Sequence, residues 1–194
     1  MLSSIYFIIV LCLISACASY DGIKARNYAT AHCDNKKHNA AYPTFPEDCT
    51  NFASQVLEAG GISQSTSWYC HKPCKKTPGS RCYNDYEYTT SWSVVDDLYN
   101  YLIKNKIARK CDLKDLQPGD LIQYNKKKTT FFFWTSDDWH HTAISITFAN
   151  KSAITAHLGS KRHKKNKAES IEKGNLLIQP TFNTFILAQD SKQL

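Results

Sequence analysis

The sequence predicts an α+β domain in which N-terminal helices pack against a C-terminal antiparallel β-sheet. Helical periodicity dominates the first half of the 194-residue chain, and short strand-like segments follow the turn at Pro118-Gly119. The length suits one ordinary domain and is short for two. A hydrophobic content of 42% excludes a disordered polymer, and no repeat of about 20–50 residues runs along the chain.

Two helices are expected before residue 60. Residues 22–32 predict a short helix with three candidate core side chains, Ile23, Tyr28 and Ala29. Residues 48–59 predict a stronger helix, because Asp48 can cap its first turn and Gly60-Gly61 can end it. Three apolar side chains share one face of this second helix: Phe52, Val56 and Leu57.

A cysteine-rich segment separates these helices from a third. The segment near residues 62–90 is rich in Ser, Lys, Cys and Tyr without a clear period, so a loop tied by disulfides is expected. Ser91 then begins a helix whose apolar face consists of Val95, Leu98, Leu102 and Ile103. The chain is therefore expected to form a single domain over residues 19–194, with the cysteine-rich segment as an insertion.

Five strands are expected after Pro118-Gly119. They span residues 120–124, 141–148, 152–158, 176–179 and 184–188. Between the first two lies a lysine-rich and aromatic segment, residues 126–139. Its aromatic run predicts either a buried strand or a loop that contacts substrate.

An apolar run at the N-terminus indicates export. Residues 5–18 have the length of a signal-peptide core and end in Ala16-Cys17-Ala18, a small-x-small pattern that signal peptidase accepts. A signal peptide over residues 1–18 and a secreted protein are therefore expected, with lipid attachment at Cys17 as the alternative. The run is too short to span a bilayer comfortably, so no membrane span is expected.

Six cysteines remain after the expected cleavage: Cys33, Cys49, Cys70, Cys74, Cys82 and Cys111. Disulfides are expected in an oxidising compartment, and if one cysteine is a reactive thiol, the other five permit at most two bridges. Three of the six lie close together between residues 70 and 82, so at least one bridge is expected there. A zinc site is the alternative, formed by Cys70, His71, Cys74 and Cys82.

Cys49 differs from the other cysteines by its position at the start of the second expected helix. Unpaired backbone N–H groups and the helix dipole stabilise an anion there, and a thiolate is the form that a cysteine nucleophile requires. By position alone, a buried or disulfide-bonded cysteine explains Cys49 equally well.

Five segments around and after Cys49 carry a family resemblance. They are Asp-Cys-Thr-Asn-Phe-Ala-Ser-Gln at 48–55 with Ala59-Gly60-Gly61, Thr90-Ser91-Trp92 with Tyr101-Leu102, Leu-Gln-Pro-Gly-Asp-Leu-Ile-Gln-Tyr at 116–124, His-Thr-Ala-Ile-Ser at 141–145, and Ala156-His157. In this order they resemble the "putative amidase domain" family of papain-like cysteine hydrolases, related to NlpC-type and CHAP-type bacterial cell-wall hydrolases. The resemblance covers roughly residues 22–158.

The resemblance implies a papain-like fold and a Cys-His dyad that hydrolyses an amide bond through a thioester, without a cofactor or metal. Cys49 matches the nucleophile and His141 the family histidine, because His141 directly precedes Thr-Ala-Ile on a strand. His157 matches the third position, where a polar side chain orients His141. The backbone N–H of Cys49 is the natural oxyanion donor, with Asp48 in support and Tyr42 as the candidate second donor.

Neighbouring residues on the same strand are candidates for substrate contact. His140 competes with His141, but strand alternation places the two on opposite faces, so only one can face Cys49. Trp139 and His140 are therefore expected to form a rim, and Trp134 belongs to the aromatic run that is a candidate for substrate contact.

The pairing of strands 141–148 and 152–158 determines whether His157 can reach His141. A three-residue turn at 149–151 places His157 opposite Ala143 and diagonal to His141, within reach of two imidazoles. A two-residue turn would place His157 on the other face. We predict the three-residue turn.

Charge suggests a partner. Residues 161–173 carry six Lys/Arg and two Glu, a local charge of +4 out of the total of +7, and Lys126-Lys127-Lys128 adds a second basic patch. An anionic polymer such as a bacterial wall or acidic glycan would be attracted to these basic loops, although solvated loops explain them more simply. No nucleic-acid motif is present.

Two other functions fit the same residues. One is a zinc-dependent amidase using His141, His157 and a third ligand such as Cys49 or an aspartate. The other is a catalytically inactive secreted binding or toxin-like module of the same fold. The expected substrate is a peptide or peptidoglycan-like amide.

Overall fold

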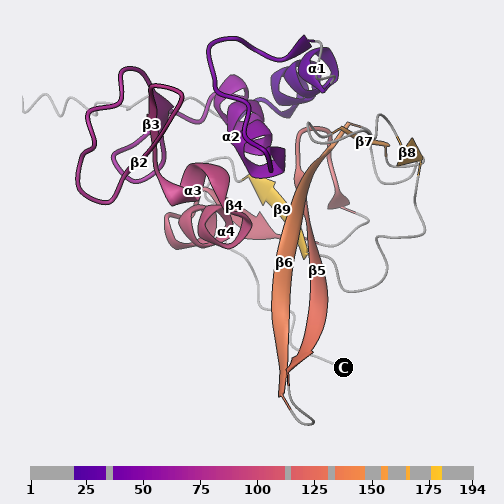
Figure 1. The fold of residues 1–194 in the computed structure, drawn as a ribbon. Coiled ribbons are helices and arrows are strands. Elements are labelled where there is room, and N and C mark those ends of the chain that lie inside the picture. The colour runs from indigo at the N-terminus through magenta and orange to yellow at the C-terminus, as the bar shows by residue number, and fades with distance from the viewer. Residues whose placement is uncertain are drawn as a thin grey trace, which may run out of the picture.

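The structure is a computed structural model that describes residues 20–33, 37–111, 115–130, 134–146, 154–156, 165–166 and 176–180. Helices and antiparallel sheets make up this part of the chain, which confirms the α+β class (Figure 1). The helices are α1 (Gly22–His32), α2 (Cys49–Ala59), α3 (Thr90–Ser93) and α4 (Val95–Lys104). Within the described ranges, no helix is both long enough and apolar enough to cross a membrane.

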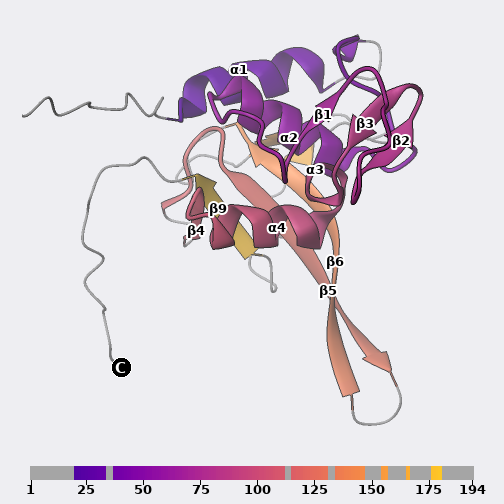
Figure 2. The same ribbon diagram turned by 90° about the vertical axis from the view of Figure 1, so that its left-hand side faces the viewer.

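Two sheets accompany these helices. The smaller one has the order β1-β3-β2, from Cys70–His71, Tyr86–Tyr88 and Arg81–Tyr83. The larger one has the order β4-β9-β5-β6-β7-β8, from Ala108–Lys110, Leu176–Pro180, Leu121–Thr130, Trp134–Ser145, Ile154–Ala156 and Lys165–Asn166. Figure 2 shows α1 and α2 on one side of α4, and the β5–β6 hairpin extending away from the helices.

The first helix has the predicted bounds but a different buried face. Asp21 begins α1 by accepting hydrogen bonds from the backbone N–H groups of Ile23 and Lys24, at 3.0 and 2.9 Å. Ala25 and Ala29 are buried, whereas Ile23 is 46% exposed, so the prediction that Ile23 belongs to the core is wrong. The small alanine side chains let α1 approach α2 closely.

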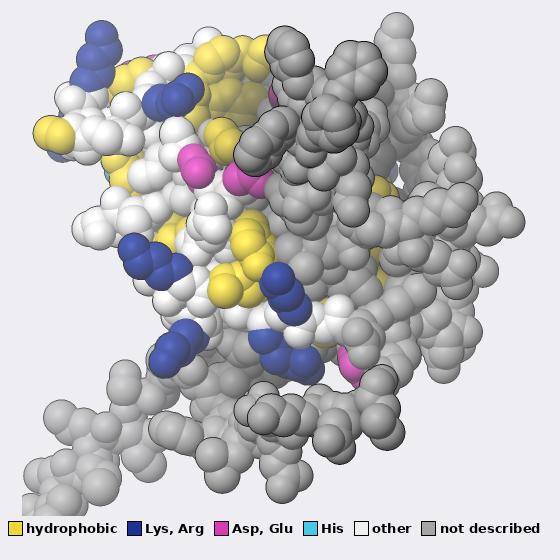
Figure 3. Space-filling model, turned by 90° about the horizontal axis from the view of Figure 1, so that it is seen from below, with side chains coloured by type: hydrophobic (Ala, Val, Ile, Leu, Met, Phe, Trp, Pro, Cys, Tyr) yellow, Lys and Arg dark blue, Asp and Glu magenta, His cyan; other side chains and the backbone are white. Residues whose placement is uncertain are grey.

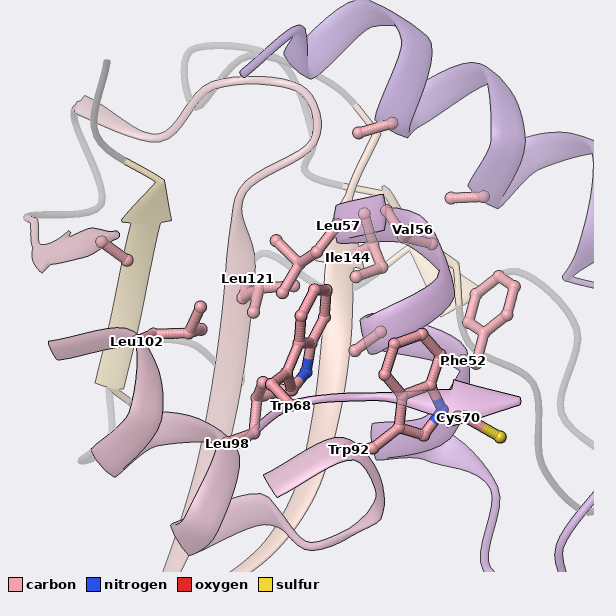
Figure 4. Packing of buried hydrophobic residues seen from close by; sticks show 14 of the residues in the cluster. Phe52, Val56, Leu57, Trp68, Cys70, Trp92, Leu98, Leu102, Leu121 and Ile144 are labelled. Atoms are coloured by element: carbon pink, nitrogen blue, oxygen red, sulfur yellow. The ribbon is translucent and has the colours of Figure 1, made fainter. Parts of the chain in front are cut away.

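The second helix begins at Cys49 and ends before Gly60, close to the predicted bounds. Every residue from Thr50 to Leu57 is buried, so α2 is surrounded on all sides rather than packed along one face. Figure 4 shows apolar side chains of α2 together with residues from α4 and the larger sheet, including Leu121 and Ile144. Trp68 and Trp92 pack against each other in this core, with ring centroids 4.9 Å apart.

The third predicted helix is divided in two. Val94 has extended backbone angles, so the chain breaks between α3 and α4. Of the predicted apolar face, Val95, Leu98 and Leu102 are buried. Ile103 is only partly buried.

The cysteine-rich segment forms the smaller sheet, where the sequence predicted a loop. Its strands contain two or three residues each, too few to show a period in the sequence. Cys74 and Cys82 form a disulfide, which confirms the expected bridge. The zinc alternative is wrong for this segment, because both of these sulfurs are bonded to each other.

The strands of the larger sheet are longer than predicted around residues 126–139. The first predicted strand extends to Thr130 in β5, and β6 begins at Trp134, so the segment belongs to a hairpin. β7 and β9 lie within or near their predicted ranges, and β4 and β8 were not predicted. The expected signal peptide and the expected strand 184–188 lie outside the described residues.

Candidate active site

Cys49 is the first residue of α2 and is half-buried. It carries a thiol rather than a disulfide, and its Sγ lies 3.8 Å from Thr50 Oγ1. The first backbone N–H groups of a helix have no partner within the helix, and its dipole is positive at this end. A thiolate at Cys49, or an oxyanion formed next to it, would therefore be stabilised.

Asp48 fixes the loop that leads into α2. Its side chain makes no hydrogen bond to the N–H groups of the helix, so the predicted capping role is wrong. Asp48 Oδ1 instead accepts from Phe45 N at 2.7 Å and from Asn51 Nδ2 at 2.8 Å. Burial raises the pKa of Asp48 to about 6, against the lowering effect of these two hydrogen bonds.

A buried polar network continues from Asp48 into the core. Asn51 Nδ2 also donates to the carbonyl of Pro43 at 2.8 Å, and Asn51 Oδ1 accepts from Trp92 Nε1 at 2.7 Å. Ser54 Oγ donates to the carbonyl of Trp92 at 2.8 Å. These contacts attach the turn that carries Cys49 to α3 on one side and to the preceding loop on the other. No role was predicted for Asn51 or Ser54, although both belong to the family-like segment.

His141 lies on β6 and is half-buried. It pairs with Tyr124 across the β5–β6 ladder, and the two rings lie 5.6 Å apart between centroids. The register places His141, Tyr124 and Ala143 on one face of the sheet. Gln123 and Thr142 lie on the other face, where Gln123 Nε2 donates to the carbonyl of Val95 at 3.1 Å.

The C-terminal end of α2 is attached beside the end of β6. Gly60 accepts a backbone hydrogen bond from Asp21 at 2.7 Å, and a Cβ on Gly60 would lie 2.3 Å from the Tyr20 ring. The Tyr20 hydroxyl donates to the Gly119 carbonyl at 2.6 Å, and Gly119 N donates to the Ser145 carbonyl at 2.7 Å.

The lengths of α2 and β6 then relate Cys49 to His141. An 11-residue helix spans about 16 Å. The four residue steps along the strand from Ser145 back to His141 span about 13 Å. α2 packs against β6 with its last turn near Ser145, so its first turn extends along the strand toward the level of His141. Ile144, which belongs to the same core cluster as Val56 and Leu57 of α2, lies on the Gln123–Thr142 face, so the His141 side chain leaves β6 on the opposite face.

The β5–β6 ladder is irregular at His140. Tyr124 pairs with His141 and Asn125 with Trp139, so His140 is the extra residue of a shift in register. An extra residue interrupts the alternation of side chains between faces. The prediction that His140 and His141 lie on opposite faces assumed an unbroken ladder; the side chain of His140 lies outside the described residues, and its orientation stays a prediction.

The pairing of β6 with β7 has the register predicted for the three-residue turn. Ile144 pairs with Ala156 and Ser145 with Thr155. The two-residue turn would have shifted these pairs by one residue, so this alternative is excluded over the described pairs. His157 itself lies outside the described residues, and its role as the orienting residue stays a prediction.

Tyr42 does not present its hydroxyl to the start of α2. The hydroxyl donates to Glu58 Oε2 at 2.7 Å, and Glu58 lies nine residues beyond Cys49, about 13 Å along the helix. The Tyr42 ring stacks on Trp92, with centroids 5.7 Å apart. The structure therefore assigns Tyr42 to packing beside the last turns of α2, and not to the oxyanion site.

The remaining predicted site residues lie on the hairpin. Trp134 and Trp139 belong to β6, where they pair with Thr130 and Asn125. Across the described ranges, no three His, Cys, Asp or Glu residues lie together as metal ligands do.

The fold and the site define an α+β domain with a thiol at the start of a central helix and a histidine on the neighbouring sheet. The chain belongs to the family described as "Putative amidase domain", which matches residues 19–175. The family's description indicates amide hydrolysis.

One curated relative and no solved structure match the chain at a significant level. The relative is "Uncharacterized protein YhbB" from Bacillus subtilis (strain 168), 28% identical over 137 residues. The matched region covers 66% of this chain and 37% of the relative, so the chain spans little more than a third of the relative's length.

Proposed function

We propose that the protein is a secreted cysteine amidohydrolase that cleaves an amide bond in a peptide or in peptidoglycan. The observation that carries this proposal is the position of Cys49, a thiol at the first turn of the buried helix α2, and His141 enters the proposal through the family resemblance. Membership in an amidase family supports the type of bond. The papain-like relation and the dependence on cysteine belong to the proposal.

In the proposed mechanism, the Cys49 thiolate attacks the amide carbonyl carbon and forms a C–S bond. The oxyanion accepts a hydrogen bond from the backbone N–H of Cys49. As the C–N bond breaks, His141 donates a proton to the leaving amine and a thioester remains. Water then loses a proton to His141 and hydrolyses the thioester, which releases the carboxylic acid and restores the thiolate.

The polar network around Asp48 supports this chemistry by holding Cys49 in place. Reacting groups must be held close to their productive geometry. Hydrogen bonds on both sides of the turn that carries Cys49 restrict its movement. Asp48 and Asn51 are positioning residues in this proposal, because neither is required to touch the substrate.

Secretion is part of the proposal. It rests on the apolar run 5–18, and the Cys74–Cys82 disulfide supports it, because disulfides persist in oxidising compartments.

The predicted attraction to an anionic polymer receives little support from the hairpin. The register pairs Lys126 with Asp138 and Lys127 with Asp137, so acidic positions lie opposite basic ones. On the face seen in Figure 3, the Lys and Arg side chains of the described residues are dispersed among uncharged and hydrophobic ones. A wall polymer as partner therefore depends on residues 161–173, of which the structure describes only 165–166.

Alkylation and turnover test the proposal together. The mature protein is treated with iodoacetamide near pH 6, and the labelled cysteine is identified by mass spectrometry. We expect Cys49 to be labelled before Cys33 or Cys70. Hydrolysis of bacterial sacculi and of peptide amides is then followed by mass spectrometry of the products, and Cys49→Ala should abolish it.

Two histidine variants and a chelator complete the test. His141→Ala should slow hydrolysis by at least about 100-fold, the usual size of a general acid–base contribution, and should also slow alkylation. His140→Ala is the matched control and should have a much smaller effect. An active Cys49→Ala protein would contradict the proposal, and so would activity that a chelator abolishes while iodoacetamide leaves it unchanged.

A further inference from the structure

An open groove lies between α4 and the cysteine-rich segment. Its volume is about 500 Å³, and Cys49 and His141 are not among the residues that line it. One wall is a stripe on α4, formed by Asp97, Asn100, Tyr101 and Lys104, whose spacing places them on one helix face. The other wall consists of the turns at 66–67 and 78–79, Tyr69 and the segment 89–91.

The wall opposite α4 is built around Glu87. This carboxylate accepts hydrogen bonds from Lys75 N at 2.7 Å, Thr77 N at 2.8 Å and Ser80 Oγ at 2.7 Å, and also from the Thr77 hydroxyl. Hydrogen bonds from the Thr77 and Ser80 side chains hold the pKa of Glu87 well below its usual range. The Cys74–Cys82 disulfide closes the same loop. The turn at 78–79 is therefore held in place before any ligand arrives.

Further hydrogen bonds fix the remainder of the groove. The Ser91 hydroxyl donates to the carbonyl of Ser67, and the hydroxyls of Ser65 and Tyr101 lie 3.0 Å apart. Tyr101 also stacks on the buried Trp68, with centroids 5.7 Å apart. A preformed site loses little conformational entropy when a ligand binds.

The chemistry of the lining selects a class of ligand. Hydroxyl and amide side chains predominate, and the two charged side chains, Asp97 and Lys104, have opposite signs. Tyr69 and Tyr101 add half-exposed aromatic rings. In a neutral ligand with many hydroxyl groups, those groups can bond to side chains that donate and side chains that accept hydrogen bonds. Flat apolar faces of the same ligand can pack on the aromatic rings. The volume lies within the range of about 300–1,000 Å³ that is typical of small-molecule sites.

We propose that this groove binds a short neutral saccharide. It differs in place from the catalytic site, because the smaller sheet separates the two. Tyr83 and Tyr88 contact Phe45, the residue bonded to Asp48, with centroids 5.0 and 4.8 Å from the Phe45 ring. Glu87 lies next to Tyr88 on the strand and therefore on the opposite face of this sheet, toward the groove. Saccharide binding consequently leaves Cys49 unoccupied.

Calorimetric titration of the mature protein with its disulfide intact tests the inference, with tri-N-acetylchitotriose as the uncharged probe. The Cys49→Ala protein is used, so that binding is measured without turnover. We expect saturable binding that Asn100→Trp weakens at least tenfold, because the exposed Asn100 lines the groove and the indole would fill it. Asp97→Asn should weaken binding about threefold or more, because it replaces a charged carboxylate, which accepts hydrogen bonds strongly, by a neutral amide.

Asp96→Asn is the matched control, since Asp96 occupies the same first turn of α4 and does not line the groove. It should bind the saccharide within twofold of the parent, and all three variants should unfold at the parent's temperature. Absence of saturable binding would overturn the inference. So would equal binding by the Asn100→Trp protein, or tighter binding of a neutral tripeptide amide than of the saccharide. Failure of amide hydrolysis would leave this result unchanged, so the two proposals are tested separately.

Discussion

The buried carboxyl of Asp48 makes the stability of the protein depend on pH in a way that one substitution removes. Asp48 is 3% exposed, and its Oδ2 has no hydrogen-bond partner within the described part of the chain. Asp48→Asn keeps the shape of the side chain and the Oδ1 acceptor for Phe45 N. It removes the charge, which is the part that burial disfavours.

The magnitude follows from the pKa of Asp48. Folding raises it from 3.8 to about 6, which corresponds to about 3 kcal/mol. Because the pKa in the folded state is higher than in the unfolded state, the native protein favours the protonated carboxyl. The stability that Asp48 contributes through its raised pKa is therefore fully present well below pH 3.8, falls as pH rises, and is lost once pH passes about 6.

Urea unfolding followed by tryptophan fluorescence at pH 4, 5, 6 and 7 measures the effect in both proteins. From pH 4 to pH 7, the free energy of unfolding of Asp48→Asn should rise relative to the parent by about 2.4 kcal/mol, because part of the unfolded carboxyl is already ionised at pH 4. His38 contributes a nearby charge that lowers the pKa of Asp48, so the comparison is repeated with His38→Gln in both proteins. A difference that stays constant within about 0.5 kcal/mol across this range would refute the reasoning.

Two further predictions concern the backbone and the cysteine-rich segment. Gly119→Ala should cost about 2–5 kcal/mol, because φ is +91° and the added Cβ would lie 2.5 Å from a backbone oxygen of α1. Gly79→Ala has a similar φ of +84° with open space around the Cβ, so it should cost only about 1–2 kcal/mol in urea unfolding; equal losses would contradict this. Glu87→Gln should speed hydrogen exchange of the amides at residues 75–80, and the stability that Glu87 contributes in the parent should be lost as pH falls below about 4.5, because its pKa is lowered by folding. Exchange unchanged by the substitution would show that the carboxylate does not hold this loop.

The elements that the sequence located well are those whose signals are local. The helix 22–32 and the helix ending at Gly60-Gly61 were predicted almost to the residue, because helical periodicity and terminal glycines act within a few residues. The disulfide near residues 70–82 was expected from proximity along the chain. The register of β6 with β7 followed from the period of two and one loop length.

The candidate nucleophile was also accessible from the sequence. Cys49 was identified from its place at a helix start and from the resemblance of its neighbours to an amidase family. Its absence from a disulfide agrees with that assignment, and the role in catalysis awaits the experiments proposed above.

Only the tertiary structure determined the partners of individual side chains. Asp48 contacts Phe45 and Asn51 in place of the helix cap, and Tyr42 contacts Glu58 in place of the oxyanion site. The smaller sheet also escaped prediction, since strands of two or three residues carry no period.

The physical reason is that a helix cap or a period acts over a few residues, whereas a hydrogen-bond partner is chosen by packing. Trp92 donates to Asn51 across 41 residues of sequence, and Tyr20 donates to Gly119 across 99. No local pattern encodes such pairs, because they form only when burial brings distant polar groups together and an unpaired group there would cost free energy.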